Sequence, residues 1–266
     1  MADLRSQVLS WLEATGFPLE MEAAAAFRNA GFEVRQSTTY TDPRAGKGRE
    51  ISLLANDPDI FGLIHLAMVV ECKSSPDPWV VLTAPDAMEA YNRLRTRAVF
   101  TERAQAALTH RRVNELGVEP LLHREGKCGY ALQQAFSQTN DLGYEAALHV
   151  LSACKALFPP TSAAGGKVAA AALPIIVVDS PLLECELQPD GTLQLTEVGY
   201  SEFLFSARLP ELLSCCIRVT TAANLAATAK WAREVANQLR KDLQPEEAAI
   251  LQELRMASAR DARHRA

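Results

Sequence analysis

A carboxylate and an amine lie two residues apart at the end of an apolar run in the first third of the chain. Residues 66–73 read Leu-Ala-Met-Val-Val-Glu-Cys-Lys, and the run stops at the turn signal Pro76-Asp77-Pro78. Such an apolar run with β-branched residues is typical of a strand that is covered on both faces. Residues i and i+2 of a strand point to the same side, about 6–7 Å apart, so we expect Glu71 and Lys73 to share a face.

Two interpretations of this pair remain open. A charged side chain at the end of a buried strand needs a partner, because burying it unpaired is costly. Glu71 and Lys73 can therefore form an ordinary salt bridge at the edge of a sheet. Alternatively, they belong to a larger site, because further polar residues precede them at regular intervals. These are Glu20 on a predicted helix, and Glu50 and Ser52 on a predicted strand.

The elements that must position these residues follow from apolar periodicity and from turn and capping signals. Helices are expected over residues 3–14, 19–30, 102–110, 142–158, 221–243 and 246–260, with a further helical piece in 87–98. Strands are expected over residues 32–40, 49–55, 64–73, 173–179, 182–188, 192–198 and 216–219, and residues 79–82 form a short apolar run. The helix over 142–158 followed by the 173–179 strand indicates a β-α-β crossover. The chain is therefore expected to be an α/β protein.

The order of these pieces resembles the PD-(D/E)XK nuclease superfamily, in particular its archaeal-resolvase-like and RecB-like members. That family has a helix with a Glu, a β-meander whose second strand carries an Asp, and a third strand that ends in Glu-x-Lys. The corresponding stretches here are Gly16-Phe17-Pro18-Leu19-Glu20, Gly31-Phe32-Glu33-Val34, Arg49-Glu50-Ile51-Ser52-Leu53-Leu54-Ala55 and Glu71-Cys72-Lys73. The resemblance covers residues 16–82, with a weaker continuation to about residue 180.

The fold implied by the resemblance is a restriction-endonuclease-like core with a central mixed sheet, helices on both of its faces and additional C-terminal helices. We expect a single domain over residues 1–266. The expected parts of this domain are a core in 16–82 and 142–180, a helical elaboration over 84–140, and a C-terminal hairpin with helices over 181–266.

The resemblance also assigns roles to individual residues. Glu71, Glu20 and a strand-two acid would bind the metal, and Lys73 would orient water and polarise developing charge. Strand two carries Ser52 where the family has its metal-binding Asp, and a hydroxyl is a poor substitute for a carboxylate on a hard cation. Glu50 lies two residues earlier on the same strand face and could replace it, or could instead pair with Arg49 or Lys47. Glu20 could equally be a first-turn acid that the helix dipole favours.

The function implied is a nuclease that uses Mg²⁺ or Mn²⁺ to hydrolyse phosphodiester bonds in nucleic acid, DNA before RNA, in prokaryotic defence or repair. Its catalytic residues would be Lys73, Glu71, Glu50 and Glu20, and its metal ligands Glu71, Glu50 and Glu20. The alternative is a catalytically inactive protein of the same fold that binds nucleic acid or a partner protein in the old cleft. A homodimer is also open.

The charge distribution offers one candidate for phosphate contacts. The formal net charge is −5 and the pI about 5.6, which argues against a protein coated in cations for nucleic-acid binding. Six arginines and only one acid nevertheless fall between Arg93 and Arg112. Within this segment Arg93, Arg95 and Arg97 are the predicted nucleic-acid contacts. A solvated helical surface is the simpler alternative.

Other features of the sequence exclude some classes of protein. No apolar run is long enough to span a bilayer, and the N-terminus lacks the pattern of a signal peptide, so we expect a cytoplasmic protein without a membrane partner. The six cysteines show no Cys-x-x-Cys spacing and are expected to be buried thiols. The five histidines are scattered and are expected in ordinary core or surface positions.

Overall fold

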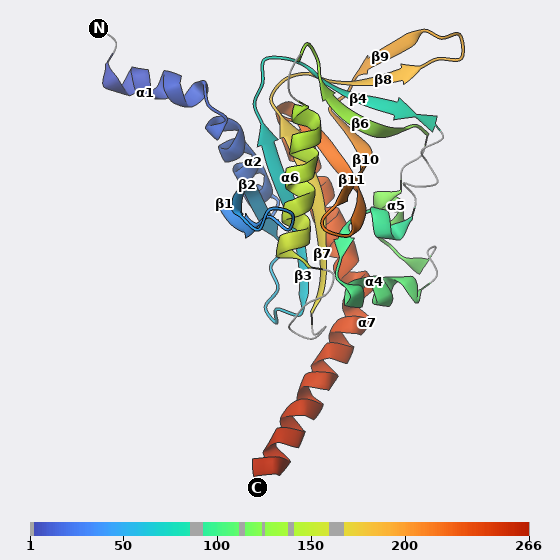
Figure 1. The fold of residues 1–266 in the computed structure, drawn as a ribbon. Helices are drawn as coiled ribbons and strands as arrows, with labels where there is room; N and C mark the ends of the chain where they lie inside the picture. The colour runs from blue at the N-terminus through green and yellow to red at the C-terminus, as the bar shows by residue number, and fades with distance from the viewer. Residues whose placement is uncertain are drawn as a thin grey trace.

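The computed structural model describes residues 3–85, 93–111, 115–123, 126–137, 141–159 and 168–265. They form one large mixed sheet of 11 strands with helices on both faces (Figure 1). The strands follow the order β1-β2-β3-β7-β11-β10-β6-β4-β8-β9, and β5 pairs with β7 beside this path. The predicted α/β class with a mixed sheet is therefore confirmed. No helix in the described part of the chain combines the length and apolarity that crossing a bilayer requires.

The elements have the following bounds. The helices are α1 (Leu4–Glu13), α2 (Phe17–Asn29), α4 (Glu102–Thr109), α5 (Glu119–Leu122), α6 (Leu142–Leu157) and α7 (Leu225–Arg265). Single 3-10 turns are η2 (Leu94–Thr96) and η4 (Ala222–Asn224). The first strands are β1 (Glu33–Thr41), β2 (Gly48–Asn56), β3 (Ile64–Lys73), β4 (Trp79–Ala84), β5 (Val99–Phe100) and β6 (Cys128–Gln134). The later strands are β7 (Ala169–Val178), β8 (Leu182–Leu187), β9 (Leu193–Glu197), β10 (Tyr200–Arg208) and β11 (Leu212–Thr221).

The first three strands form an antiparallel meander, and β7 extends it in parallel beside β3. β2 and β3 pair from Leu53↔Val70 to Asn56↔Ala67. β3 and β7 pair along their whole length, from Ile64↔Ala169 to Lys73↔Val178, after the chain has crossed over through α6. The predicted neighbourhood of the 49–55 and 64–73 strands and the predicted crossover are thus confirmed.

Helix α2 is short and rich in alanine, which lets it lie close to the sheet. Pro18 occupies its first turn, and Gly31 follows its end with φ +85°, a conformation that costs glycine little. Its buried residues are Leu19, Ala23, Ala24 and Phe27. Because this face is fixed against the sheet, Glu20 in the first turn is held at one end of the helix, beside the sheet.

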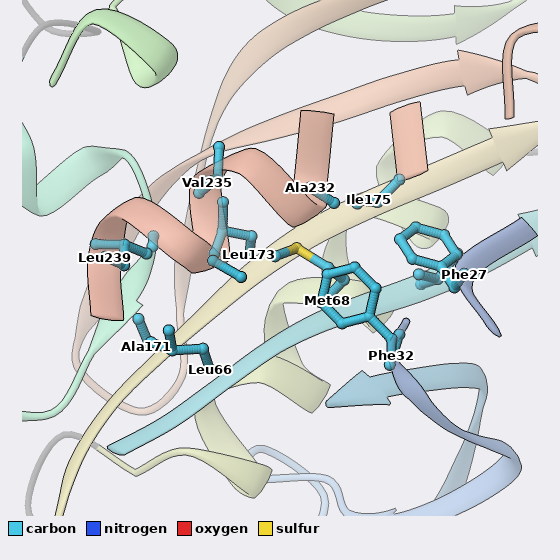
Figure 2. Close-up of a cluster of buried hydrophobic side chains, with 14 of the residues drawn as sticks. Phe27, Phe32, Leu66, Met68, Ala171, Leu173, Ile175, Ala232, Val235 and Leu239 are labelled. Carbon is cyan, nitrogen blue, oxygen red and sulfur yellow. The ribbon is translucent and has the colours of Figure 1, made fainter. Parts of the chain in front are cut away.

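The hydrophobic core has two halves, one on each face of the sheet. Figure 2 shows the half in which α2 and α7 pack on β3 and β7, with Met68 and Leu173 lying between Phe27 of α2 and Val235 of α7 in one buried cluster. Each large side chain buried here contributes about 1.5–3 kcal/mol. Helix α6 covers the other face, and a Cβ on its Gly143 would lie 2.0 Å from the carbonyl oxygen of Leu132. Glycine therefore permits the close approach that fixes the start of α6 on β6.

Several elements differ from the expectation. β6 and β10 were not predicted, because β6 contains a glycine and two glutamines, and β10 has near its start the polar residues Ser201 and Glu202, of which Ser201 is fully buried. The stretch 84–140 is consequently not only helical. Part of the helix expected over 87–98 lies outside the described residues, and the part that is described forms η2 followed by β5.

The two helices expected over 221–243 and 246–260 are one continuous helix, α7, with Pro245 inside it. Contacts on both sides of the proline hold the helix together. Before it, Asp57 at the end of β2 accepts ion pairs from Arg233 and Arg240. After it, Arg103 of α4 pairs with Glu246 at 2.5 Å and with Glu253 at 2.8 Å. These contacts offset the hydrogen bond that proline cannot donate.

Replacing Pro245 tests whether the helix is continuous. Proline inside a helix costs roughly 3 kcal/mol relative to alanine. We therefore expect Pro245→Ala to raise the free energy of unfolding, by up to about 3 kcal/mol, as measured by urea denaturation. Ala248→Gly, one turn further along, should lower it by about 1 kcal/mol. A chain with a true helix break at residue 245 would instead gain little stability from the alanine.

Asp59 organises the loop between β2 and β3. Its carboxylate accepts hydrogen bonds from the backbone N–H groups of Phe61 (3.1 Å), Leu63 (2.8 Å) and Ile64 (2.8 Å). Burial tends to raise its pKa, but these donors and Arg240 outweigh that effect and lower it. In the folded protein Asp59 therefore stays ionised at pH values below its ordinary pKa.

The pKa of Asp59 predicts a dependence of stability on pH. A carboxylate whose pKa is lower in the folded state stabilises the fold above its unfolded pKa of about 3.9, and this contribution is lost as the pH falls through the folded pKa. Asp59→Asn should lower the free energy of unfolding by about 1–3 kcal/mol at pH 7 and by clearly less at pH 3. Glu197→Gln, on the exposed strand β9, is the control and should change stability little. An equal loss at both pH values would contradict the role of the charge.

Candidate active site

Residues far apart in the sequence meet at the carboxyl end of β3. Glu71 and Lys73 are among the last three residues of this strand. Ser52 of β2 lies beside them, since its Oγ accepts a hydrogen bond from the backbone N–H of Cys72 (3.2 Å). Glu20 of α2 interacts with the Ser52 side chain. The structure thus brings together Glu20, Ser52, Glu71 and Lys73.

Glu71 is buried and ionised. Only 6% of the residue is exposed, and its Oε1 lies 2.7 Å from Lys73 Nζ. Burial tends to raise its pKa, but His149, whose Nδ1 lies 3.7 Å from Oε1, and the charge of Lys73 outweigh burial and hold the pKa below its ordinary value. The salt bridge that the sequence left open is therefore present. This salt bridge is compatible with a chemical role. Glu71 and Lys73 can pair with each other before a substrate binds and contact the substrate afterwards.

Glu20 has the opposite shift. Burial raises its pKa, and the negative charges of Glu71 and Glu50 raise it further, against a smaller lowering by Ser52 and Lys73. Three acids from α2, β2 and β3 therefore repel one another at this place. Such mutual repulsion is relieved by a bound cation.

Glu50 is exposed at the edge of the cluster. It pairs in register with Thr39 of β1 and forms no ion pair with a described residue. Pairing of Glu50 with Arg49 was one expectation, but Arg49 binds other groups. Two other acids do not contribute to this site. Asp57 forms ion pairs with α7, and Asp59 accepts backbone hydrogen bonds within the β2–β3 loop.

Sequence reasoning missed His149, Arg49 and Asp42. Arg49 Nε lies 2.6 Å from Asp42 Oδ2, Arg49 Nη1 lies 2.8 Å from His149 Nε2, and His149 Nδ1 lies 3.7 Å from Glu71 Oε1. His149 was expected in an ordinary position, although it stands on the crossover helix α6, which covers the strand that carries Glu71. A polar residue on the sheet-facing side of that helix was the available signal.

The predicted nucleic-acid contacts lie elsewhere. Arg97 is only 6% exposed, and its Nη1 is 4.0 Å from the sulfur of Cys216, so it faces the core rather than solvent. Arg93 and Arg95 are exposed and line a surface cavity of about 410 Å³ together with Ser214 of β11. Four residues after Ser214, Arg218 of β11 pairs with Ile175 of β7, which in turn pairs with Val70 of β3. Measured along the strands, Ser214 therefore lies about 13 Å behind the level of Val70, away from the end of the sheet that carries Glu71. These arginines are not part of the carboxylate cluster.

Reversing the two exposed charges tests this second surface. If Arg93 and Arg95 contact phosphates, replacing both with Glu should weaken DNA binding and lower the slope of log affinity against log salt by about two units, since each lost contact removes about one. Fluorescence anisotropy with a labelled oligonucleotide measures both quantities. Arg255→Glu, on the exposed end of α7, is the control. Unchanged affinity and slope in the double variant would identify this stretch as a solvated surface only.

Comparisons with known proteins add no identification. Neither a scan against protein-family models nor searches of curated proteins and of solved structures found a match to this chain. In the described part of the chain no group of three or more His, Cys, Asp or Glu side chains is arranged to hold a metal ion. A function must therefore be argued from the geometry of the site itself.

Proposed function

We propose that this chain is a PD-(D/E)XK-type nuclease that hydrolyses phosphodiester bonds in DNA. The observation that carries the proposal is the ion pair of Glu71 and Lys73 at the end of β3, with Glu20 of α2 close enough for both charges to shift its pKa. The sequence resemblance requires these residue types on a first helix and a third strand. The spatial cluster could have failed to form, because 51 residues separate Glu20 from Glu71 in the chain.

The arrangement of the elements supports a restriction-endonuclease-like core. A helix (α2), an antiparallel meander (β1 to β3), a crossover helix (α6) and a parallel strand (β7) follow in this order, and β11 continues in parallel beside β7. In this proposal the remaining strands, from β10 to β9, are an extension of that core. They lie on the side of the sheet away from Glu71.

The donor atoms fit a magnesium or manganese ion that keeps most of its water. Mg²⁺ is usually held by one or two protein carboxylates together with water and substrate phosphate oxygens. Glu71 and Glu20 supply two carboxylates whose charges already repel each other, and Glu50 supplies a third acid at the rim. Such an ion would supply Lewis-acid polarisation of a phosphate oxygen and an activated water.

The other residues would bind and orient the substrate. The Lys73 amine is partly exposed and is fixed by Glu71, so it can donate to a phosphate oxygen or to the attacking water. Arg49 has a side chain that is 42% exposed at the same rim and can contact a neighbouring phosphate. All six cysteines are thiols rather than disulfides, which fits action on DNA in the reducing cytoplasm.

A second function is favoured by one observation. Ser52 occupies the strand-two position and already satisfies the Cys72 backbone N–H, while Lys73 pairs with Glu71 and His149 lies beside it. Ser52, Glu71 and Lys73 thus have protein partners without a cation. A protein of this kind would bind DNA or a partner protein without cleaving it.

Variants of Glu50, the acid on strand β2, distinguish the nuclease from the catalytically inactive protein. If Glu50 is a ligand, Glu50→Gln and Glu71→Ala should each lower cleavage of single- or double-stranded DNA by about 10²–10³-fold with Mg²⁺ or Mn²⁺, at unchanged circular dichroism. Ser52→Asp should then help little, because it crowds another acid around the same ion. Glu22→Gln is the matched control, because Glu22 is an exposed acid on α2, the helix that carries Glu20, and this variant should cleave like the wild type.

Two other results would contradict this proposal, the first its nuclease activity and the second its active site. The silent protein would show no wild-type cleavage, no effect of Glu50→Gln and new metal binding in Ser52→Asp. Strong cleavage that survives both Glu50→Gln and Glu71→Ala would place the active site elsewhere.

A further inference from the structure

His149 is fixed in place by the fold of the crossover helix. α6 is buried along its sheet-facing side, and its first turn touches β6 at Gly143. From the other direction, the hydroxyl of Tyr40 in β1 donates to the backbone carbonyl of His149 at 3.3 Å. The ring therefore faces β3 without depending on a flexible segment.

The partners of the ring determine which nitrogen carries its proton. Arg49 Nη1 lies 2.8 Å from His149 Nε2, and a guanidinium is always a donor, so Nε2 must accept. A neutral ring then has its single proton on Nδ1, the nitrogen that faces Glu71. Asp42 holds Arg49 from behind at 2.6 Å, and Asp42 is itself fixed by the backbone N–H of Arg44 at 2.8 Å.

Both partners of Glu71 converge on one of its oxygens. Lys73 Nζ is 2.7 Å and His149 Nδ1 is 3.7 Å from Oε1. No described residue forms a hydrogen bond to Oε2, which is also not among the fully buried polar atoms that lack a partner. The carboxylate is thus held with one oxygen occupied and the other available.

We propose that His149 is a positioning residue, which Arg49 fixes as the Nδ1–H tautomer so that Glu71 presents Oε2 to a divalent cation. This role rests on the proposed nuclease function. Groups that orient a metal-binding carboxylate usually matter about 10- to 100-fold for metal affinity. The chain Asp42, Arg49, His149, Glu71 would then link the β1–β2 turn to the site.

The experiment measures metal affinity and tautomer separately. Mn²⁺ binding to the full chain by calorimetry should weaken about 10- to 100-fold in His149→Ala. His149→Asn, whose amide can replace the Nδ1–H donor, should recover part of this loss. His65→Ala is the matched control, because His65 lies at the other end of β3, where its Nε2 is 3.1 Å from the carbonyl oxygen of Gly62. It should bind Mn²⁺ like the wild type.

Nitrogen NMR of the metal-free protein gives the second readout. The wild-type His149 ring should show a protonated Nδ1 and an unprotonated Nε2, and Arg49→Ala should populate the other tautomer. Mn²⁺ affinity unchanged in His149→Ala, or a wild-type ring protonated on Nε2, would overturn the proposal. A wild type that binds no Mn²⁺ while its ring has the expected tautomer would instead overturn the nuclease function and leave only the positioning of Glu71 supported.

Discussion

The negative charge of Glu71 must be balanced inside a strand that has protein on both faces. β3 carries five consecutive fully buried apolar residues immediately before Glu71, so water cannot supply the compensation. The fold instead supplies Lys73 from the same strand and His149 from α6. Much of the local architecture follows from this requirement, because both donors must be rigid if the buried carboxylate is to remain ionised.

The rigidity comes from the sheet and from the two helices that flank β3. β7 pairs with β3 residue by residue up to Lys73, which prevents the end of the strand from fraying. α2 and α6 lie on opposite faces, and each contributes one polar residue at the same end of the sheet, Glu20 and His149. An apolar core on each side thus positions a polar cluster at its edge.

The sequence predicted the parts of the fold that have strong local patterns. The meander, α2, α6 and β7 were predicted because they are apolar, periodic or bounded by Gly and Pro. β6 and β10 were not, because their stability comes from neighbouring strands and not from an alternating pattern. The uninterrupted α7 also escaped prediction, since a proline ends most helices unless long-range contacts hold it.

The candidate site divides in the same way. Glu20, Ser52, Glu71 and Lys73 could be grouped in advance because the order of their elements along the chain resembles a known arrangement. The contact of His149 with Arg49 could not, because 100 residues separate them and no local pattern pairs the two residues. Arg97 shows the reverse error, in which a local run of positive charge concealed a buried side chain.

Helix α7 makes the molecule much longer in one direction than its sheet requires. Its 41 residues span about 60 Å, and residues 252–259 are fully on the surface where the helix extends past the sheet (Figure 1). Nearer its start, Arg233 of this helix donates to the carbonyl of Ala30 at the end of α2. The projecting end is therefore continuous with the helical segment that contacts α2, the helix that carries Glu20.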